Sequence, residues 1–147
     1  MKGGVKCSKR KTVDILIRNF EEKDAKALEV ILKLNGQFDY PEIENRESMI
    51  RVSNCEAAIF LVAKLDQSVC GCLKAIYDGS RAMIHLVSVH PDYQSKGIAT
   101  KLVDTAINKL SGLGAPSVSV TVSDESQGYW KKLGFSALPV YIMLKNT

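Results

Sequence analysis

The residues whose types and spacing most clearly indicate a binding site lie between Pro91 and Leu110, where an apolar run is followed by a polar loop and then by a helical pattern. Apolar residues recur at the spacing of one buried helical face, at Ile98, Ala99, Leu102, Val103, Ala106, Ile107 and Leu110. The first N–H groups of a helix lack intrahelical partners, and with the helix dipole they attract anions. Gly97 allows a ligand to approach the backbone closely, and Lys96 and Lys101 add positive charge. The stretch therefore predicts a site for a pyrophosphate group.

Two familiar phosphate motifs, Gly-x-x-x-x-Gly-Lys-Ser/Thr and Gly-x-Gly-x-x-Gly, are absent. The loop instead reads Gln94-x-x-Gly97-x-Ala99, and a second motif, Tyr-Trp-Lys-Lys-Leu-Gly-Phe, follows at residues 129–135. The two resemble the Gln/Arg-x-x-Gly-x-Gly/Ala and Phe-Tyr-Glu-Lys-Leu-Gly-Phe signatures of the GNAT superfamily, the N-acetyltransferases that use acetyl-CoA. The resemblance covers residues 13–145. The alternative for the loop alone is an ordinary strand-to-helix turn that binds nothing.

The resemblance implies that acetyl-CoA is the acyl donor and that no metal takes part. In the family, the pantetheine arm pairs with the strand before the loop, the loop backbone holds the phosphates, and a Gln or Arg orders the loop. Serine and aromatic residues near the second motif would lie beside the arm. The predicted donor-binding residues are Val87, Ser88, Val89, Gln94, Ser95, Lys96, Gly97, Ile98, Ala99, Thr100, Ser123, Ser126, Tyr129 and Trp130.

The resemblance also implies direct transfer, in which an amine attacks the thioester and an acid protonates the departing thiolate. Met83 stands where many relatives carry a glutamate base, and Trp130 stands where the acid is usually a tyrosine. His85 shares the face of Met83 on an extended strand, and an imidazole suits a general base. Tyr129 neighbours Trp130 and is the candidate acid. The alternatives are a structural strand histidine for His85 and packing beside CoA for Tyr129.

Together these observations predict an N-acetyltransferase that acts on a primary amine of a small molecule, peptide or protein, in a ternary complex. Residues 34–50 carry a local charge of −3, from Asp39, Glu42, Glu44 and Glu47 against Arg46, which favours a cationic acceptor. The alternative is a non-catalytic acyl-CoA-binding sensor or regulatory module, which the missing glutamate and tyrosine favour. A nucleotide-binding domain lacks a supporting motif. The resemblance leaves a homodimer open.

The elements that would position these residues follow from periodicity and turn residues. Predicted strands span residues 13–18, 57–64, 69–77, 82–89, 117–122 and 135–145. One predicted helix begins near residue 21 and ends at Asn35–Gly36, and three others span residues 42–52, 98–110 and 124–133. The order β-α-α-β-β-β-α-β-α-β predicts the α/β class, and the resemblance specifies a GNAT-like mixed, splayed β-sheet with helices on both faces.

The length of 147 residues fits one domain, residues 13–147, and 46% hydrophobic with 24% charged residues is typical of soluble proteins. The net charge of +4 comes from a basic arm, residues 1–12, which we expect to be mobile. Without its five cations, 15 basic residues face 16 acidic ones, and no basic stripe predicts nucleic-acid binding. No apolar run approaches the ~20 residues of a membrane span. The four cysteines lack metal-ligand spacing, so we expect no metal site. The cysteine pattern suits the reducing cytoplasm, and we expect a cytoplasmic protein without a membrane partner.

Overall fold

A five-stranded mixed sheet forms the centre of the protein, and the computed structural model describes residues 14–147. The strands lie in chain order across the sheet: β1 (Ile15–Asn19), β2 (Ala58–Leu65), β3 (Ser68–Tyr77), β4 (Ala82–Val89) and β5 (Val118–Val120). The first four pair antiparallel, whereas β5 runs parallel to β4. The predicted α/β class and mixed sheet are confirmed. The predicted arm, residues 1–12, and Val13 lie outside the described residues.

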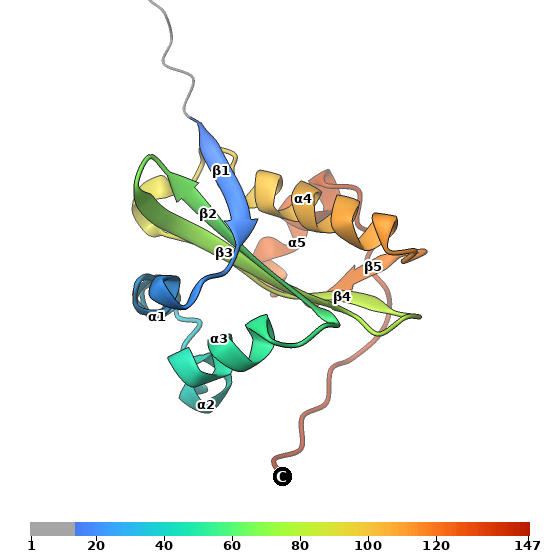
Figure 1. Cartoon of the computed structure of the whole chain (residues 1–147). Coiled ribbons are helices and arrows are strands. Elements are labelled where there is room, and N and C mark those ends of the chain that lie inside the picture. Colours follow the sequence, from blue (N-terminus) through green and yellow to red (C-terminus); the bar gives the residue numbers. More distant parts are fainter. Residues whose placement is uncertain (1–13) are drawn as a thin grey trace, which may run out of the picture.

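Helices cover both faces of the sheet, as predicted (Figure 1). One face carries α1 (Ala25–Leu34), α2 (Pro41–Glu44) and α3 (Arg46–Ser53), and the other carries α4 (Ile98–Gly112) and α5 (Gln127–Lys132). Short 3-10 helices, Glu22–Asp24, Pro91–Tyr93 and Asp124–Ser126, precede α1, α4 and α5. Each face has its own core, and the period of two along a strand sends Leu61 into one core and Val62 into the other.

The predicted helix over residues 42–52 is wrong in its extent, because the structure interrupts it at Asn45. This residue is extended (ψ 172°), and its side chain accepts a hydrogen bond from Ser48 N at 2.8 Å. Asn45 is therefore the N-cap of α3, a role for which asparagine is well suited. The preceding four-residue α2 is a separate element that begins at Pro41.

β4 and β5 diverge beside a bulge in β4. The pairing of β3 with β4 shifts by one residue after Lys74, which lies opposite Leu86, and leaves His85 as an extra residue. β5 pairs with β4 only from Ala82 to Ile84, so the strand predicted over residues 117–122 is shortened to three residues. Past this point β4 has no strand on that side within the described part of the chain. The predicted splay of the sheet is therefore present.

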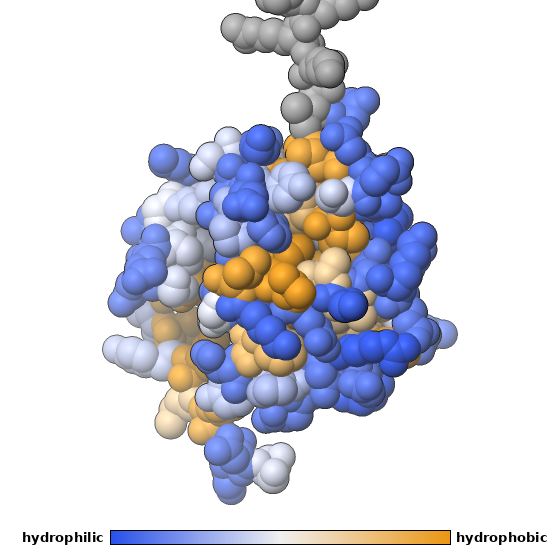
Figure 2. Space-filling view, turned by 90° about the vertical axis from the view of Figure 1, so that its left-hand side faces the viewer, coloured by the Kyte–Doolittle hydropathy of each residue, from blue (hydrophilic) through white to orange (hydrophobic). Residues whose placement is uncertain are grey.

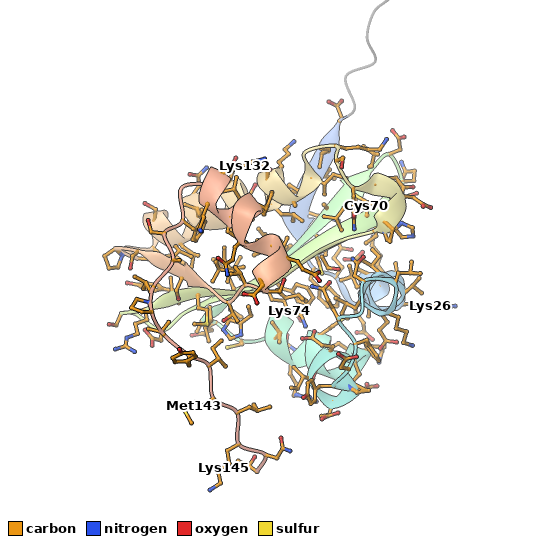
Figure 3. All side chains as sticks on the ribbon, turned by 180° about the vertical axis from the view of Figure 1, so that it is seen from behind. Lys26, Cys70, Lys74, Lys132, Met143 and Lys145 are labelled. Atoms are coloured by element: carbon orange, nitrogen blue, oxygen red, sulfur yellow. The ribbon has the colours of Figure 1, made fainter. Side chains whose placement is uncertain are left out.

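The predicted strand over residues 135–145 is wrong, because the chain forms no strand after α5. The segment leaves the body toward the C-terminus, and Figure 3 labels Met143 and Lys145 on it. Its large apolar side chains are 68–94% exposed, namely Leu138, Val140, Tyr141, Ile142, Met143 and Leu144. Val140 N donates to Leu138 O at 2.9 Å around Pro139, which has no N–H for a ladder. An apolar run becomes a strand only when a neighbour pairs with it, and residues 14–147 provide none here.

Hydrophobic residues also reach the surface of the body. Figure 2 shows one such area surrounded by hydrophilic residues. Exposed apolar side chains of β1 and α1 include Leu16, Val30 and Leu34. Among the helices that the structure describes, none is long and apolar enough to cross a membrane.

Candidate active site

A groove of about 1030 Å³ opens where β4 and β5 diverge. Its walls come from the second half of β4, the end of β5, the loop before α4, the start of α5 and the residues after α1. Every predicted site residue except Lys96 lines it: His85, Val87, Ser88, Val89, Gln94, Ser95, Gly97, Ile98, Ala99, Thr100, Ser123, Ser126, Tyr129 and Trp130. The fold thus brings the two sequence motifs together, and the role of each residue stays a prediction.

The loop at one end of the groove presents backbone N–H groups. Ser95 (φ 63°) and Gly97 (φ 82°) are both left-handed, a geometry that turns successive N–H groups toward a shared concavity for anions. Gly97 is the N-cap of α4, and Lys101 N donates to Gly97 O at 3.0 Å. The N–H groups of residues 98–100 therefore have no partner within the helix, and the first turn of α4 holds no acidic residue. This end of the groove can bind a diphosphate.

Asn35 and Gln37 also line the groove, and sequence reasoning missed both. They flank Gly36 (φ 65°), which ends α1 in a Schellman motif. In this motif, Gly36 N donates to Lys33 O at 3.2 Å and Gln37 N donates to Leu32 O at 2.8 Å. The Asn-Gly pair indicated the end of a helix, but nothing in the sequence indicated that the flanking amides face β4.

Three side-chain amides donate to the carbonyl groups at the free edge of β4. Asn35 Nδ2 and Gln94 Nε2 lie 2.8 and 3.1 Å from Val89 O. Gln37 Nε2 lies 3.3 Å from Val87 O. Gln94 thereby ties the loop to β4, and Asn35 ties the end of α1 to the same carbonyl.

The free edge of β4 therefore offers mainly donors to a ligand. On the other edge, His90 N donates to Cys70 O of β3 at 2.8 Å. Because backbone groups alternate along a strand, the N–H groups of Val87 and Val89 point away from β3 and toward the groove. Their carbonyl groups are already covered by the amides. A polar arm in the groove could pair with β4 as an added strand does.

The two catalytic candidates occupy different parts of the groove. Met83 and His85 are exposed, whereas Ala82 and Ile84 are buried, so Met83 and His85 share one face of β4. The Tyr129 hydroxyl lies 3.3 Å from Thr100 Oγ1 in the first turn of α4. Trp130 is only 8% exposed and packs in the core. An imidazole on the bulge of β4 can accept a proton there, whereas the Tyr129 hydroxyl lies near the loop.

The sheet cysteines do not provide a nucleophile. Burial raises the pKa of Cys70 to about 11 and that of Cys72 to about 12, so both thiols are protonated at neutral pH. Neither cysteine lines the groove. Within residues 14–147, no three His, Cys, Asp or Glu side chains are grouped to hold a metal ion. The polar groups that line the groove include backbone N–H groups, side-chain amides and hydroxyls, the carboxylate of Glu125 and the imidazole of His85.

The acidic stretch over residues 34–50 is partly neutralised by a residue outside it. Lys74 Nζ lies 2.5 Å from Glu44 Oε2. Of the four acids in the stretch, Asp39 and Glu42 have no ion-pair partner within the described residues. The charge available to an acceptor is therefore smaller than the sequence count indicates.

The described geometry is a diverging mixed sheet with a loop at the start of α4 whose N–H groups are free for an anion. A sequence model of the acetyltransferase (GNAT) family matches residues 29–135. The chain belongs to the GNAT acetyltransferase family. It is an acyltransferase.

Solved structures share this fold at low sequence identity. PaiA N-acetyltransferase from Thermoplasma acidophilum, in complex with coenzyme A, is 18% identical, with a TM-score of 0.78 over 87% of this chain and 93% of that one. Aminoglycoside N-acetyltransferase AAC(6')-Iy, in complex with CoA, is 14% identical, with a TM-score of 0.77 over 93% and 97%. A transcriptional regulator from Bacillus halodurans C-125 is 21% identical, with a TM-score of 0.74 over 90% and 100%. At these identities the likeness establishes the fold alone.

Proposed function

We propose that the protein transfers the acetyl group of acetyl-CoA directly to a primary amine of a small molecule, peptide or protein, in a ternary complex. One observation carries the proposal. A single groove contains the N–H groups of the loop, the free edge of β4 and the imidazole of His85. A long acyl donor with a diphosphate at one end and a thioester at the other would need these groups in this order.

The proposed reaction assigns a task to each part of the groove. The loop amides from Ser95 to Thr100 hold the diphosphate, and the N–H groups of Val87 and Val89 orient the arm and the thioester. The amine nitrogen attacks the carbonyl carbon, and the N–H of Val89 stabilises the oxyanion. His85 accepts the proton that the amine loses. The C–N bond forms, the C–S bond breaks, and water protonates the thiolate, since the Tyr129 hydroxyl lies near Thr100.

The acceptor that we propose is a cationic amine. Asp39 lies between α1 and α2, and Glu42 lies in α2. Neither has an ion-pair partner in the described chain, and both would attract an ammonium group. Acetyltransfer to an amino compound is also in the name of the aminoglycoside N-acetyltransferase that shares this fold.

The second candidate is an acyl-CoA sensor without catalytic activity. Met83 and Trp130 replace the usual base and acid, and one protein of the same fold is described as a transcriptional regulator. A sensor would bind CoA through the same loop but would not need His85.

One experiment separates the two functions. The protein is incubated with acetyl-CoA and a panel of spermidine, kanamycin, glucosamine 6-phosphate and a lysine peptide, and thiol release and N-acetylated product are measured. Calorimetry measures CoA affinity in parallel. Turnover on an amine supports the acetyltransferase, whereas saturable CoA binding without turnover on any amine supports the sensor.

We further propose a homodimer, in which the exposed segment 138–144 of one chain pairs with the outer edge of β5 of the other. That edge lacks a strand in the described residues, and the segment is apolar throughout. Burial of one Leu, Ile or Val side chain removes roughly 60–120 Å² of apolar surface from water. Two such segments, together with the surfaces that they cover, would therefore bury the ~1,200 Å² that a specific interface needs. Light scattering of the full chain and of a chain truncated after Phe135 tests this. A monomeric full chain would contradict it.

A further inference from the structure

The short helix α2 is held by few contacts. None of its residues is buried, and Ile43 is 55% exposed. Toward α3, Ser48 Oγ donates to Glu42 O at 2.7 Å. Toward the sheet, Glu44 of α2 forms an ion pair with Lys74 of β3.

The Lys74–Glu44 ion pair is largely buried. Nζ and Oε2 are 2.5 Å apart, and the two side chains are 8% and 17% exposed. The ammonium group also lies 5.3 Å from the ring centroid of Phe60. By contrast, Arg46 of α3 and Glu22 form a pair whose side chains are 50% and 60% exposed. A buried charge that loses its partner is costly, whereas an exposed pair contributes little, so the two pairs should behave differently.

The buried pair lies next to the part of the groove that contains His85. Lys74 is opposite Leu86 at the register shift that leaves His85 as the extra residue, and both β4 residues line the groove. In Figure 3, Lys74 lies where the sheet faces α2 and α3. The other end of the connecting segment is fixed too, because Asn35 and Gln37 donate to β4 carbonyl groups.

The segment from Gln37 to Glu44 is therefore fastened at both ends, by an amide on β4 and by an ion pair on β3. We propose that Lys74 and Glu44 are a positioning pair that holds this segment beside the acceptor end of the groove. This inference rests on the proposed amine acetyltransferase function. Neither residue lines the groove, so the pair acts through the segment that it holds. Its loss should impair acceptor binding and leave CoA binding to the loop unchanged.

Lys74→Met and Glu44→Gln test the pair, because each leaves a buried polar group without its charged partner. Amide hydrogen exchange in residues 38–45 should accelerate by about tenfold or more, while exchange in β2 and β4 keeps its rate. CoA affinity, measured by calorimetry, should stay within about twofold of the wild type. With spermidine as the acceptor probe, KM for spermidine should rise by about tenfold and KM for acetyl-CoA should not change.

The double variant Lys74→Met/Glu44→Leu distinguishes positioning from direct binding. It replaces the ion pair with an apolar contact, an exchange that is often neutral for stability. If the pair positions the segment, the double variant restores slow exchange and brings KM for spermidine to within about threefold of the wild type. Slow exchange with an unrestored KM would mean that the charge itself binds the amine, which overturns the positioning role. Arg46→Met, which breaks the exposed pair, is the matched control and should change neither measurement.

Two further results would overturn the inference: unchanged exchange in residues 38–45 of both single variants, or equal acceleration along the whole chain. Lack of turnover on every amine tested would instead refute the proposed function. Exchange and calorimetry need no turnover, so they decide on the pair in either case.

Discussion

The two ends of the groove are built from different kinds of group. At the loop end, backbone N–H groups are free for a ligand, and their position depends on the left-handed conformation of Ser95 and Gly97 and on the start of α4. At the end that we propose for the acceptor, side chains line the groove, and they come from the bulge of β4 and the segment after α1. A site made of backbone is specified by local sequence, because turn residues and helix starts are local. A site made of side chains depends on contacts between elements far apart in the chain.

The largest expected effect comes from filling the loop end. Gly97→Glu should weaken CoA binding more than ~100-fold, about 2.7 kcal/mol, because it puts a negative charge in the anion site and a side chain at φ 82°. Calorimetry measures the affinity, and circular dichroism checks the fold. Gly79→Glu is the matched control, since Gly79 has a φ of 95° in the β3–β4 turn and does not line the groove. Retained CoA affinity in Gly97→Glu would refute a diphosphate site at this loop.

At the acceptor end, His85→Ala should lower kcat by roughly 100-fold if His85 is the general base. Steady-state kinetics with the amine that is turned over measures kcat of the variant and of the wild type. CoA affinity should stay unchanged. The other histidine, His90, does not line the groove, so His90→Ala is the control. If His85→Ala keeps the wild-type kcat, another group is the base.

A smaller effect is expected where the two ends meet. Gln94→Ala removes the donor to Val89 O and should weaken CoA binding roughly fivefold, about 1 kcal/mol, because the loop is no longer tied to β4. Gln127→Ala removes an exposed hydrogen bond to Asp124, and since neither residue lines the groove, it should leave CoA affinity unchanged. Equal affinities in both variants would show that the loop is ordered by other contacts.

The smallest effect is expected for Tyr129→Phe. The hydroxyl contacts Thr100 Oγ1 at 3.3 Å, so its loss should change kcat and CoA affinity by less than about threefold. A loss of kcat by roughly 100-fold without a change in affinity would instead identify Tyr129 as the acid that protonates the thiolate. Steady-state kinetics with acetyl-CoA and the amine that is turned over distinguishes these outcomes.

Sequence reasoning was most successful where local rules decide the structure. The strands predicted over residues 57–64, 69–77 and 82–89 and the helix predicted from residue 98 are in place. The turns before and after the second of these strands contain Asp66 and Gly79, which are left-handed, as is Gly97 at the start of the helix. It was wrong for the segment 135–145, whose apolar run predicted a strand but whose partner is not among the described residues. It overcounted negative charge near Glu44, since Lys74 is 30 residues away in the chain. It missed Asn35 and Gln37 because their contacts with β4 are tertiary.

The divergence of β4 from β5 also affects the stability of the folded protein. Past Ile84 the sheet lacks a row of hydrogen bonds, and the arm of the acyl donor would supply it from outside the polypeptide. Donor present at a hundred times its Kd adds about 2.7 kcal/mol to the free energy of unfolding. The arm of the bound donor would then stabilise the fold as well as carry the acetyl group, and the protein would be least stable when CoA is scarce.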